Sequence, residues 1–284
     1  MSIKFLTPER LICGVHELSL ARPLIMGIVN VTPDSFSDGG KFLRPDRAIL
    51  QARQLIGEGA DIIDIGGEST RPGAAAVSLQ EELDRVMPVL VALAREGVPV
   101  SVDTQKTQVM QEAIKQGVAM INDVNALQAI GAVEICAASK VALCLMHKQG
   151  ASGSMQQAPE YQNVVTEVRD FLLIRADACR TAGIKSERIV IDPGFGFGKT
   201  AAHNFVLLRE LNVLVQSGYT VLAGFSRKSS LGLITGRTAN DRLAASLATA
   251  LIAMQHGAKI IRVHDVKETV DVMKIWLATA NAHL

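Results

Sequence analysis

The sequence contains few aromatic residues and carries almost no net charge. Phe, Trp and Tyr make up 4% of its 284 residues although 48% are hydrophobic, so the core must consist mainly of Ala, Val, Ile and Leu. Such an aliphatic composition is typical of parallel sheets that helices cover on both faces. The 29 basic and 28 acidic residues give a formal charge of +1, which argues against a nucleic-acid-binding surface and favours small-molecule partners.

Cysteine is also scarce and shows no paired spacing. Cys13, Cys136, Cys144 and Cys179 form no CxxC pair. We expect buried or inert thiols in a reducing compartment, without a structural zinc. The charged N-terminal stretch has no apolar signal region, and no later stretch is long enough to span a bilayer. The expected location is therefore the cytoplasm, without a membrane partner.

Strand and helix patterns alternate along the whole chain. The apolar run 24–29 predicts a strand buried on both faces, and apolar residues at helical spacing follow over 46–58. The further predicted strands are 61–66, 98–103, 118–122, 141–147, 188–192, 219–226 and 258–265. The further predicted helices are 79–96, 107–116, 129–138, 164–182, 205–216, 240–256 and 266–280.

Eight strand-then-helix units predict an α/β fold, a single-domain (β/α)8 TIM barrel over residues 22–284. Residues 1–21 lie outside the repeating units and are expected to form an extension that caps the bottom of the barrel. The alternative is an open doubly wound sheet. It would need a glycine-rich dinucleotide turn after the first strand, where this chain reads NVTPDS.

Polar side chains follow the predicted strands where each one ends. The C-terminal ends of barrel strands converge on one mouth, so these side chains are expected to share a site. A single Asp after a strand could equally be a helix cap, but eight such positions in register favour a site. The positions are Asn30, Glu68 with Thr70 and Arg71, Asp103, Asn122, Met146 with His147, Asp192, Ser226 with Lys228, and Arg262 with His264.

Two glycine-rich stretches do not match the motifs that they suggest. DPGFGFGKT has Pro193 and Lys199 where phosphate-loop and dinucleotide motifs need glycine, and GFSRKSSLG has Lys228 where a nucleophile elbow needs its second glycine. Neither motif therefore predicts a site of its own.

The same stretches, taken together, resemble a known family. MGIVNVTPDSFSDGG, DIGGESTRPGA, SVDTQK, IND, LMH, DPGFGFGK, GFSRKS and IRVHDVKET are similar, in this order, to dihydropteroate synthases over residues 22–280. The resemblance implies a homodimeric transferase of folate biosynthesis that uses Mg²⁺ and is a target of sulfonamides. Its reaction would join p-aminobenzoate to (7,8-dihydropterin-6-yl)methyl diphosphate through a C–N bond, releasing pyrophosphate and 7,8-dihydropteroate.

The resemblance also implies a pterin pocket. A pterin presents N–H donors beside acceptors, which carboxylates and an amide can satisfy. By resemblance, the residues of this pocket are Asp103, Asn122, Asp192, Lys228 at the ring's O4 side, and Met146 and Phe197 on its faces. A solvated loop lysine is the alternative for Lys228.

A second subsite should bind the diphosphate. Arg262 and His264 alternate on the last strand and so point to the same side. By resemblance they bind the diphosphate with Thr70 and Arg71, and Asn30 is a Mg²⁺ ligand whose partners come mainly from diphosphate and water. A structural ion pair is the alternative for Arg262.

The arylamine would bind between the first two loops and the start of a helix at Ser229. By resemblance Phe36 and Pro72 build this pocket, and the carboxylate of p-aminobenzoate lies near Ser229. The diphosphate is already a good leaving group, so we expect a dissociative displacement in which Asp34, Lys228 and Arg71 are catalytic.

Two other functions remain open. A pterin-binding barrel that presents methyltetrahydrofolate to a corrinoid protein would share the pterin pocket, and a non-catalytic paralogue would share the fold. The intact VTPDSF and STRPG loops and the Arg262–His264 pair favour the transferase. The helix around 242–254 is apolar nearly all round, which suggests burial against a second subunit.

Overall fold

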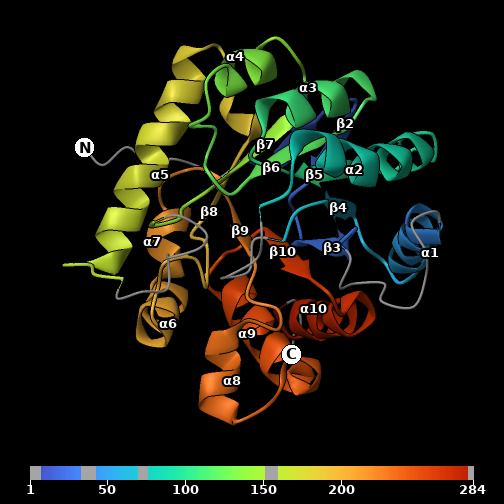
Figure 1. The fold of residues 1–284 in the computed structure, drawn as a ribbon. Coiled ribbons are helices and arrows are strands. Elements are labelled where there is room, and N and C mark those ends of the chain that lie inside the picture. Colours follow the sequence, from blue (N-terminus) through green and yellow to red (C-terminus); the bar gives the residue numbers. More distant parts are fainter. Residues whose placement is uncertain (1–7, 33–42, 70–75, 151–158, 281–284) are drawn as a thin grey trace.

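A computed structural model describes residues 8–32, 43–69, 76–150 and 159–280. Within these residues, eight parallel strands close into a barrel in the order β10-β3-β4-β5-β6-β7-β8-β9. Helices form a ring outside the strands (Figure 1). The predicted (β/α)8 barrel is therefore confirmed, and the open sheet is not formed.

Most barrel strands end at or next to the site residues that the sequence predicts there, but β9 ends at Ala223, three residues before Ser226. β3 covers Leu24–Asn30, and its partner across the closing seam is β10, Ile260–Val263. The other barrel strands are β4 Ile62–Gly66, β5 Val100–Asp103, β6 Met120–Asp123, β7 Ala142–Met146, β8 Ile189–Asp192 and β9 Thr220–Ala223.

Most helices lie close to their predicted positions. They are α1 Leu43–Gly57, α2 Leu79–Ala94, α3 Thr107–Lys115, α4 Ala132–Ala137, α5 Val164–Thr181, α6 Ala201–Arg209, α7 Leu211–Val215, α8 Ser229–Thr235, α9 Leu243–Gln255 and α10 Val266–Ala280, with short 3₁₀ turns η2 Ser186–Arg188 and η3 Ala239–Asp241.

The prediction of one helix over 205–216 is wrong. This stretch belongs to two helices, α6 and α7, and α6 begins four residues earlier. The Thr200 side chain accepts a hydrogen bond from the His203 backbone, and the His203 ring accepts one from the Thr200 backbone. This reciprocal capping starts the helix before the first apolar residue that the pattern used.

A two-stranded hairpin, β1 Arg10–Cys13 and β2 His16–Ser19, covers the N-terminal ends of the barrel strands. Cys13 Sγ lies 3.3 Å from the Ala119 carbonyl just before β6, and Lys259 Nζ, just before β10, lies 2.9 Å from the Leu20 carbonyl. Leu11, Cys13 and Leu20 are buried in one cluster with inward-facing strand residues such as Met120. That end of the barrel is thus filled by apolar side chains.

No helix of the described residues is both long and apolar enough to cross a membrane.

Candidate active site

Arg262 occupies the centre of the C-terminal end of the barrel. Its Nε lies 2.7 Å from Asp64 Oδ2, and its Nη2 lies 2.9 Å from Asp103 Oδ2. Only 18% of the Arg262 side chain is exposed, so these are largely desolvated ion pairs. The ion pair that the sequence leaves open for Arg262 is therefore present.

Asp64 is a site residue that the sequence analysis missed. It lies on β4, it is fully buried, and its Oδ2 also accepts a hydrogen bond from Asn122 Nδ2 at 3.0 Å. Its Oδ1 has no hydrogen-bond partner among the described residues. A signal was available, because an acidic residue inside an otherwise apolar strand has to be paired when it is buried.

Asp103 and Asp192 complete the acidic part of the site from β5 and β8. The pKa of Asp103 is raised to about 7, mainly by burial and in part by nearby Asp64. The positive charge of Arg262 opposes this rise. Burial also raises the pKa of Asp192, while a 2.7 Å hydrogen bond from the Gly194 N–H opposes that rise. Both carboxyl groups face an environment that favours a ligand carrying hydrogen-bond donors.

An apolar wall adjoins these carboxylates. Met146, Phe197 and Val124 form one buried cluster, and Lys228 Nζ lies 4.0 Å from the centre of the Phe197 ring. The lysine is thereby held against an aromatic face by a cation–π contact. The structure thus brings Met146, Phe197 and Lys228 together, as the sequence predicts.

His264 faces the site as a neutral side chain. Burial lowers the pKa of His264 to about 3, and the positive charge of Arg262 contributes. Ser226 Oγ lies 3.1 Å from Nδ1 and also accepts the His264 backbone N–H at 3.3 Å. In the tautomer in which the Ser226 hydroxyl donates to Nδ1, the ring proton lies on Nε2 and can be donated to an anion. The positive charge at this position comes from Arg262.

Asn30 ends β3 beside Gly66 and Asp103. A Cβ placed on Gly66 would lie 3.6 Å from Asn30 Oδ1 and 3.7 Å from the Cβ of Asp103. Within the described residues, no group of three or more His, Cys, Asp or Glu side chains could hold a metal ion. One amide oxygen suffices only where diphosphate and water supply the other ligands.

The segment that carries Thr70, Arg71 and Pro72 lies outside the described residues, as do Asp34 and Phe36. The residues at its root are described. Glu68 accepts hydrogen bonds from the Val77 N–H at 3.1 Å and from Lys106 Nζ at 2.7 Å. This carboxylate therefore connects the two ends of the segment 70–75 to the loop that follows Asp103.

Ser229 is exposed and begins α8, directly after Lys228. The chain reaches it through Arg227, whose backbone is left-handed at φ +57° and whose guanidinium pairs with Asp265. Arg242 Nη1 donates to the carbonyls of Arg227 and Lys228 at 3.1 and 3.3 Å. These contacts fix the turn that presents Lys228 and Ser229 at the mouth.

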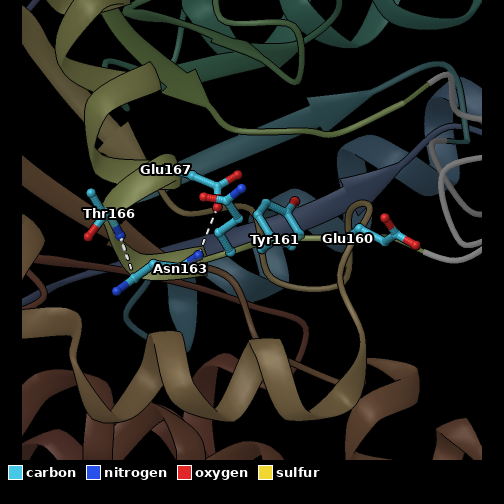
Figure 2. Close-up of a pocket in the computed structure, with 6 residues that line it drawn as sticks. Glu160, Tyr161, Asn163, Thr166 and Glu167 are labelled. Carbon is cyan, nitrogen blue, oxygen red and sulfur yellow. Dashed lines mark hydrogen bonds between the residues drawn. The ribbon is translucent and has the colours of Figure 1, made fainter.

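A separate hollow lies at the N-terminal end of α5 (Figure 2). It measures about 540 Å³ and is lined by Glu160, Tyr161, Gln162, Asn163, Thr166 and Glu167. None of the strand-end residues lines it, so it is distinct from the barrel mouth. The Tyr161 hydroxyl nevertheless donates to the Gly198 carbonyl at 2.8 Å, on the outer side of the loop that carries Phe197.

The comparisons with known proteins identify the family of the chain. The pattern of the pterin-binding enzymes matches residues 26–264. The chain is 52% identical to the dihydropteroate synthase of Haemophilus influenzae over 266 residues, which cover 93% of this chain and 97% of the relative.

Solved structures give the same result. A Burkholderia cenocepacia dihydropteroate synthase complexed with 7,8-dihydropteroate is 45% identical, with a TM-score of 0.88 over 96% of this chain and 97% of that one. A Yersinia pestis dihydropteroate synthase in a sulfonamide drug complex is 48% identical, with a TM-score of 0.91 over 96% of this chain and 100% of that one. The chain therefore belongs to the dihydropteroate synthase family of pterin-binding enzymes.

Proposed function

We propose that the mouth of the barrel joins p-aminobenzoate to the dihydropterin diphosphate through the residues described above. The observation that carries this proposal is the buried set of Asp64, Asp103, Asn122 and Asp192 around Arg262. A pterin ring carries adjacent N–H donors that Asp192 and Asp103 can accept, and the Asn122 amide can supply both a donor and an acceptor. Met146 and Phe197 would pack on the ring faces.

Arg262 is proposed to change partners when the substrate binds. Its Nη2 donates to Asp103, and a pterin N–H could replace it at that carboxylate. The guanidinium would keep Asp64 through Nε and turn Nη2 toward the diphosphate, where His264 Nε2–H would join it. Because the Asp64 pair remains, the arginine would stay oriented throughout.

The reaction itself needs positioning and electrostatic stabilisation more than an activated nucleophile. The C–O bond to the diphosphate breaks as the arylamine nitrogen forms the new C–N bond, and the amine proton leaves with solvent or pyrophosphate. We expect Asp34 to stabilise the pterin cation, Arg71 and Thr70 to bind the leaving group, and Lys228 to lie between the two substrates. Mg²⁺ with Asn30 as a ligand would neutralise the diphosphate charge.

The arylamine is proposed to bind beside Ser229, with Phe36 and Pro72 on its other side. Ser229 is exposed next to Lys228, so a carboxylate or a sulfonyl group could reach both. Sulfonamides should therefore compete with p-aminobenzoate, as the Yersinia pestis complex suggests for that relative.

A homodimer and a cytoplasmic location are also proposed. Leu233 and Ile234 on α8 are 75% and 70% exposed, and Leu243 and Ile252 on the neighbouring α9 are 38% and 37% exposed. These apolar side chains would be covered by a second copy of the chain. All four cysteines are buried free thiols, which suits a reducing compartment.

Pyrophosphate release tests the proposed function. The purified chain with the dihydropterin diphosphate, Mg²⁺ and p-aminobenzoate should release pyrophosphate and form 7,8-dihydropteroate, and omission of p-aminobenzoate should stop product formation. Lys115→Met, in an exposed ion pair on α3, is a matched control that should keep full activity. Binding of pterin without turnover would support the corrinoid-linked barrel. The similarity to dihydropteroate synthases does not favour that alternative. Binding of neither substrate would indicate a non-catalytic paralogue.

A further inference from the structure

Lys199 is a buried lysine that the proposed reaction does not use. It lies in the loop 193–200 between β8 and α6, and only 2% of the residue is exposed. Its Nζ lies 2.9 Å from His147 Nδ1, 3.0 Å from the Gly194 carbonyl and 3.0 Å from the Phe197 carbonyl. The His147 carbonyl lies 3.3 Å away. Three backbone oxygens and a ring nitrogen therefore converge on one amine.

This environment is built for a protonated amine. An ammonium has three N–H donors to share among the four acceptors, whereas a neutral amine has only two. His147 can accept at Nδ1 because it is neutral: burial lowers the pKa of His147 to about 3, and the charge of Lys199 contributes. Burial also lowers the pKa of Lys199 to about 7, against the attraction of Asp192. The convergent carbonyls favour the charged form at that position.

The loop around Lys199 brings several backbone carbonyls close together, and Lys199 Nζ contacts three of them. Gly194, Gly196 and Gly198 all have positive φ, at +67°, +81° and +61°. A Cβ on Gly194 would lie 2.0 Å from the His147 carbonyl oxygen, and one on Gly198 would lie 2.2 Å from the Gln149 carbonyl oxygen. The loop is thus pressed against the chain that leaves β7, with carbonyl dipoles brought close together. Positive charge among these dipoles offsets their repulsion.

The loop also carries contacts that the pterin pocket depends on. The Gly194 N–H donates to Asp192 Oδ1 at 2.7 Å, and Phe197 supplies the ring under Lys228 Nζ. Lys199 binds the carbonyls of these same two residues, Gly194 and Phe197. A shift of the loop would therefore move a carboxylate, an aromatic ring and the lysine above it together.

We propose that Lys199 is a positioning residue for pterin recognition, which holds the loop 193–198 against His147 so that Asp192 and Phe197 face the ring. This inference rests on the proposed function, because it assumes that the pocket binds a pterin. Lys199 acts through its neighbours and does not itself contact the ligand.

The test compares Lys199→Met with the wild-type chain by calorimetric titration with pterin and by steady-state kinetics. Pterin affinity should fall roughly tenfold or more, since misplaced supporting groups commonly cost about that much. The KM for the dihydropterin diphosphate should rise more than the KM for p-aminobenzoate, because Asp192 and Phe197 face the pterin, whereas Ser229 lies on a different loop. A merely structural role would lower the melting temperature and leave this split between the two KM values absent.

Lys259→Met is the matched control. Lys259 also donates to a backbone carbonyl, that of Leu20, but at the opposite end of the barrel. This variant should lose thermal stability without losing pterin affinity. Unchanged pterin affinity in a folded Lys199→Met would overturn the inference. Absence of pterin binding in the wild-type chain would instead refute the proposed function.

Tyr161→Phe covers the case in which Lys199→Met does not fold. It removes the Tyr161 hydroxyl (Figure 2), which donates to the Gly198 carbonyl of the same loop, and leaves the buried amine in place. Pterin affinity should fall about twofold to fivefold in this variant. The loss is smaller than in Lys199→Met because only one hydrogen bond to the loop is removed. If the affinity equals that of the wild type, the placement of this loop does not control pterin binding and the inference is wrong.

Discussion

The two ends of the barrel interior are built on the same inward faces of the same strands, but they differ in chemistry. Toward the hairpin, the interior contains Ile62, Met120, Val190 and Ile260, packed with Leu11 and Leu20. Side chains alternate along a strand, so two residues further on the same faces carry Asp64, Asn122, Asp192 and Arg262. On each of these four strands, two residues thus separate an apolar layer from a polar and charged one.

This contrast indicates how the barrel separates stability from chemistry. The apolar end gains free energy by removing side chains from water, and it needs no specific partner for any of them. The charged end is stable only while each buried carboxylate keeps its partner, such as Asp64 with Arg262. Substitutions at the apolar end should therefore change stability alone, and substitutions at the charged end should change ligand affinity as well.

Arg262→Ala should have the largest effect, because it leaves Asp64 charged and unpaired in a fully buried position. We expect a loss of about 3 to 5 kcal/mol in the free energy of unfolding, together with loss of pyrophosphate release. Urea unfolding and the activity assay measure the two effects. Arg10→Ala, which removes an exposed pair with Glu17 at the hairpin end, should lower the free energy of unfolding far less and leave turnover intact. Equal losses of unfolding free energy in Arg262→Ala and Arg10→Ala would contradict the proposed difference between the two ends of the barrel.

Leu11→Ala should destabilise the protein without touching recognition. Leu11 is fully buried under the barrel, and truncating such a side chain costs about 2 to 5 kcal/mol. Thermal unfolding measures the loss, and pterin titration below the transition should give the wild-type affinity. Weaker pterin binding in this variant would show that the two layers are coupled.

Asp192→Asn should show the opposite pattern. The amide keeps an oxygen for the Gly194 N–H, so stability should change little, but a donor now faces the donors of the pterin. The pterin affinity should fall by about 2 to 3 kcal/mol, which calorimetric titration would resolve. Wild-type affinity in this variant would remove Asp192 from the pocket.

A gradual effect of pH on stability should originate from Asp103. Its pKa is raised from the ordinary value of 3.8 to about 7 in the folded state. Between these two values the folded state keeps a proton that the unfolded state has released, so this group makes the protein less stable as pH rises through that window. Asp103→Asn should flatten the profile of unfolding free energy against pH. Asp170→Asn, at an exposed pair with Arg169, should leave the profile unchanged.

The barrel was predictable because its repeating pattern is strong. The strand that begins at Leu24 and the helix Val266–Ala280 lie where the apolar spacing places them. The hairpin β1–β2 was expected only as a covering extension, since four-residue strands with mixed polarity give little periodic signal. The start of α6 was missed because a capping pair, and not an apolar stripe, determines it.

The site was predictable where a polar residue ends a strand and less so where it lies inside one. Asp103, Asn122 and Asp192 follow apolar runs, whereas Asp64 is enclosed by Ile63 and Ile65 and was treated as part of a buried strand. Lys199 was considered only as a mismatch to phosphate-binding motifs. Its role depends on carbonyl groups that come from two loops, and sequence spacing does not report such three-dimensional convergence.

The hairpin under the barrel has a consequence for molecular traffic. Leu11, Cys13 and Leu20 pack with strand residues such as Met120, so apolar side chains fill this end of the barrel. On the proposed placement, a pterin at Asp64 and Asn122 would lie deeper than an arylamine near Ser229, so the pterin would have to enter first. The joined product would leave from the end of the barrel opposite the hairpin before the next pterin could bind.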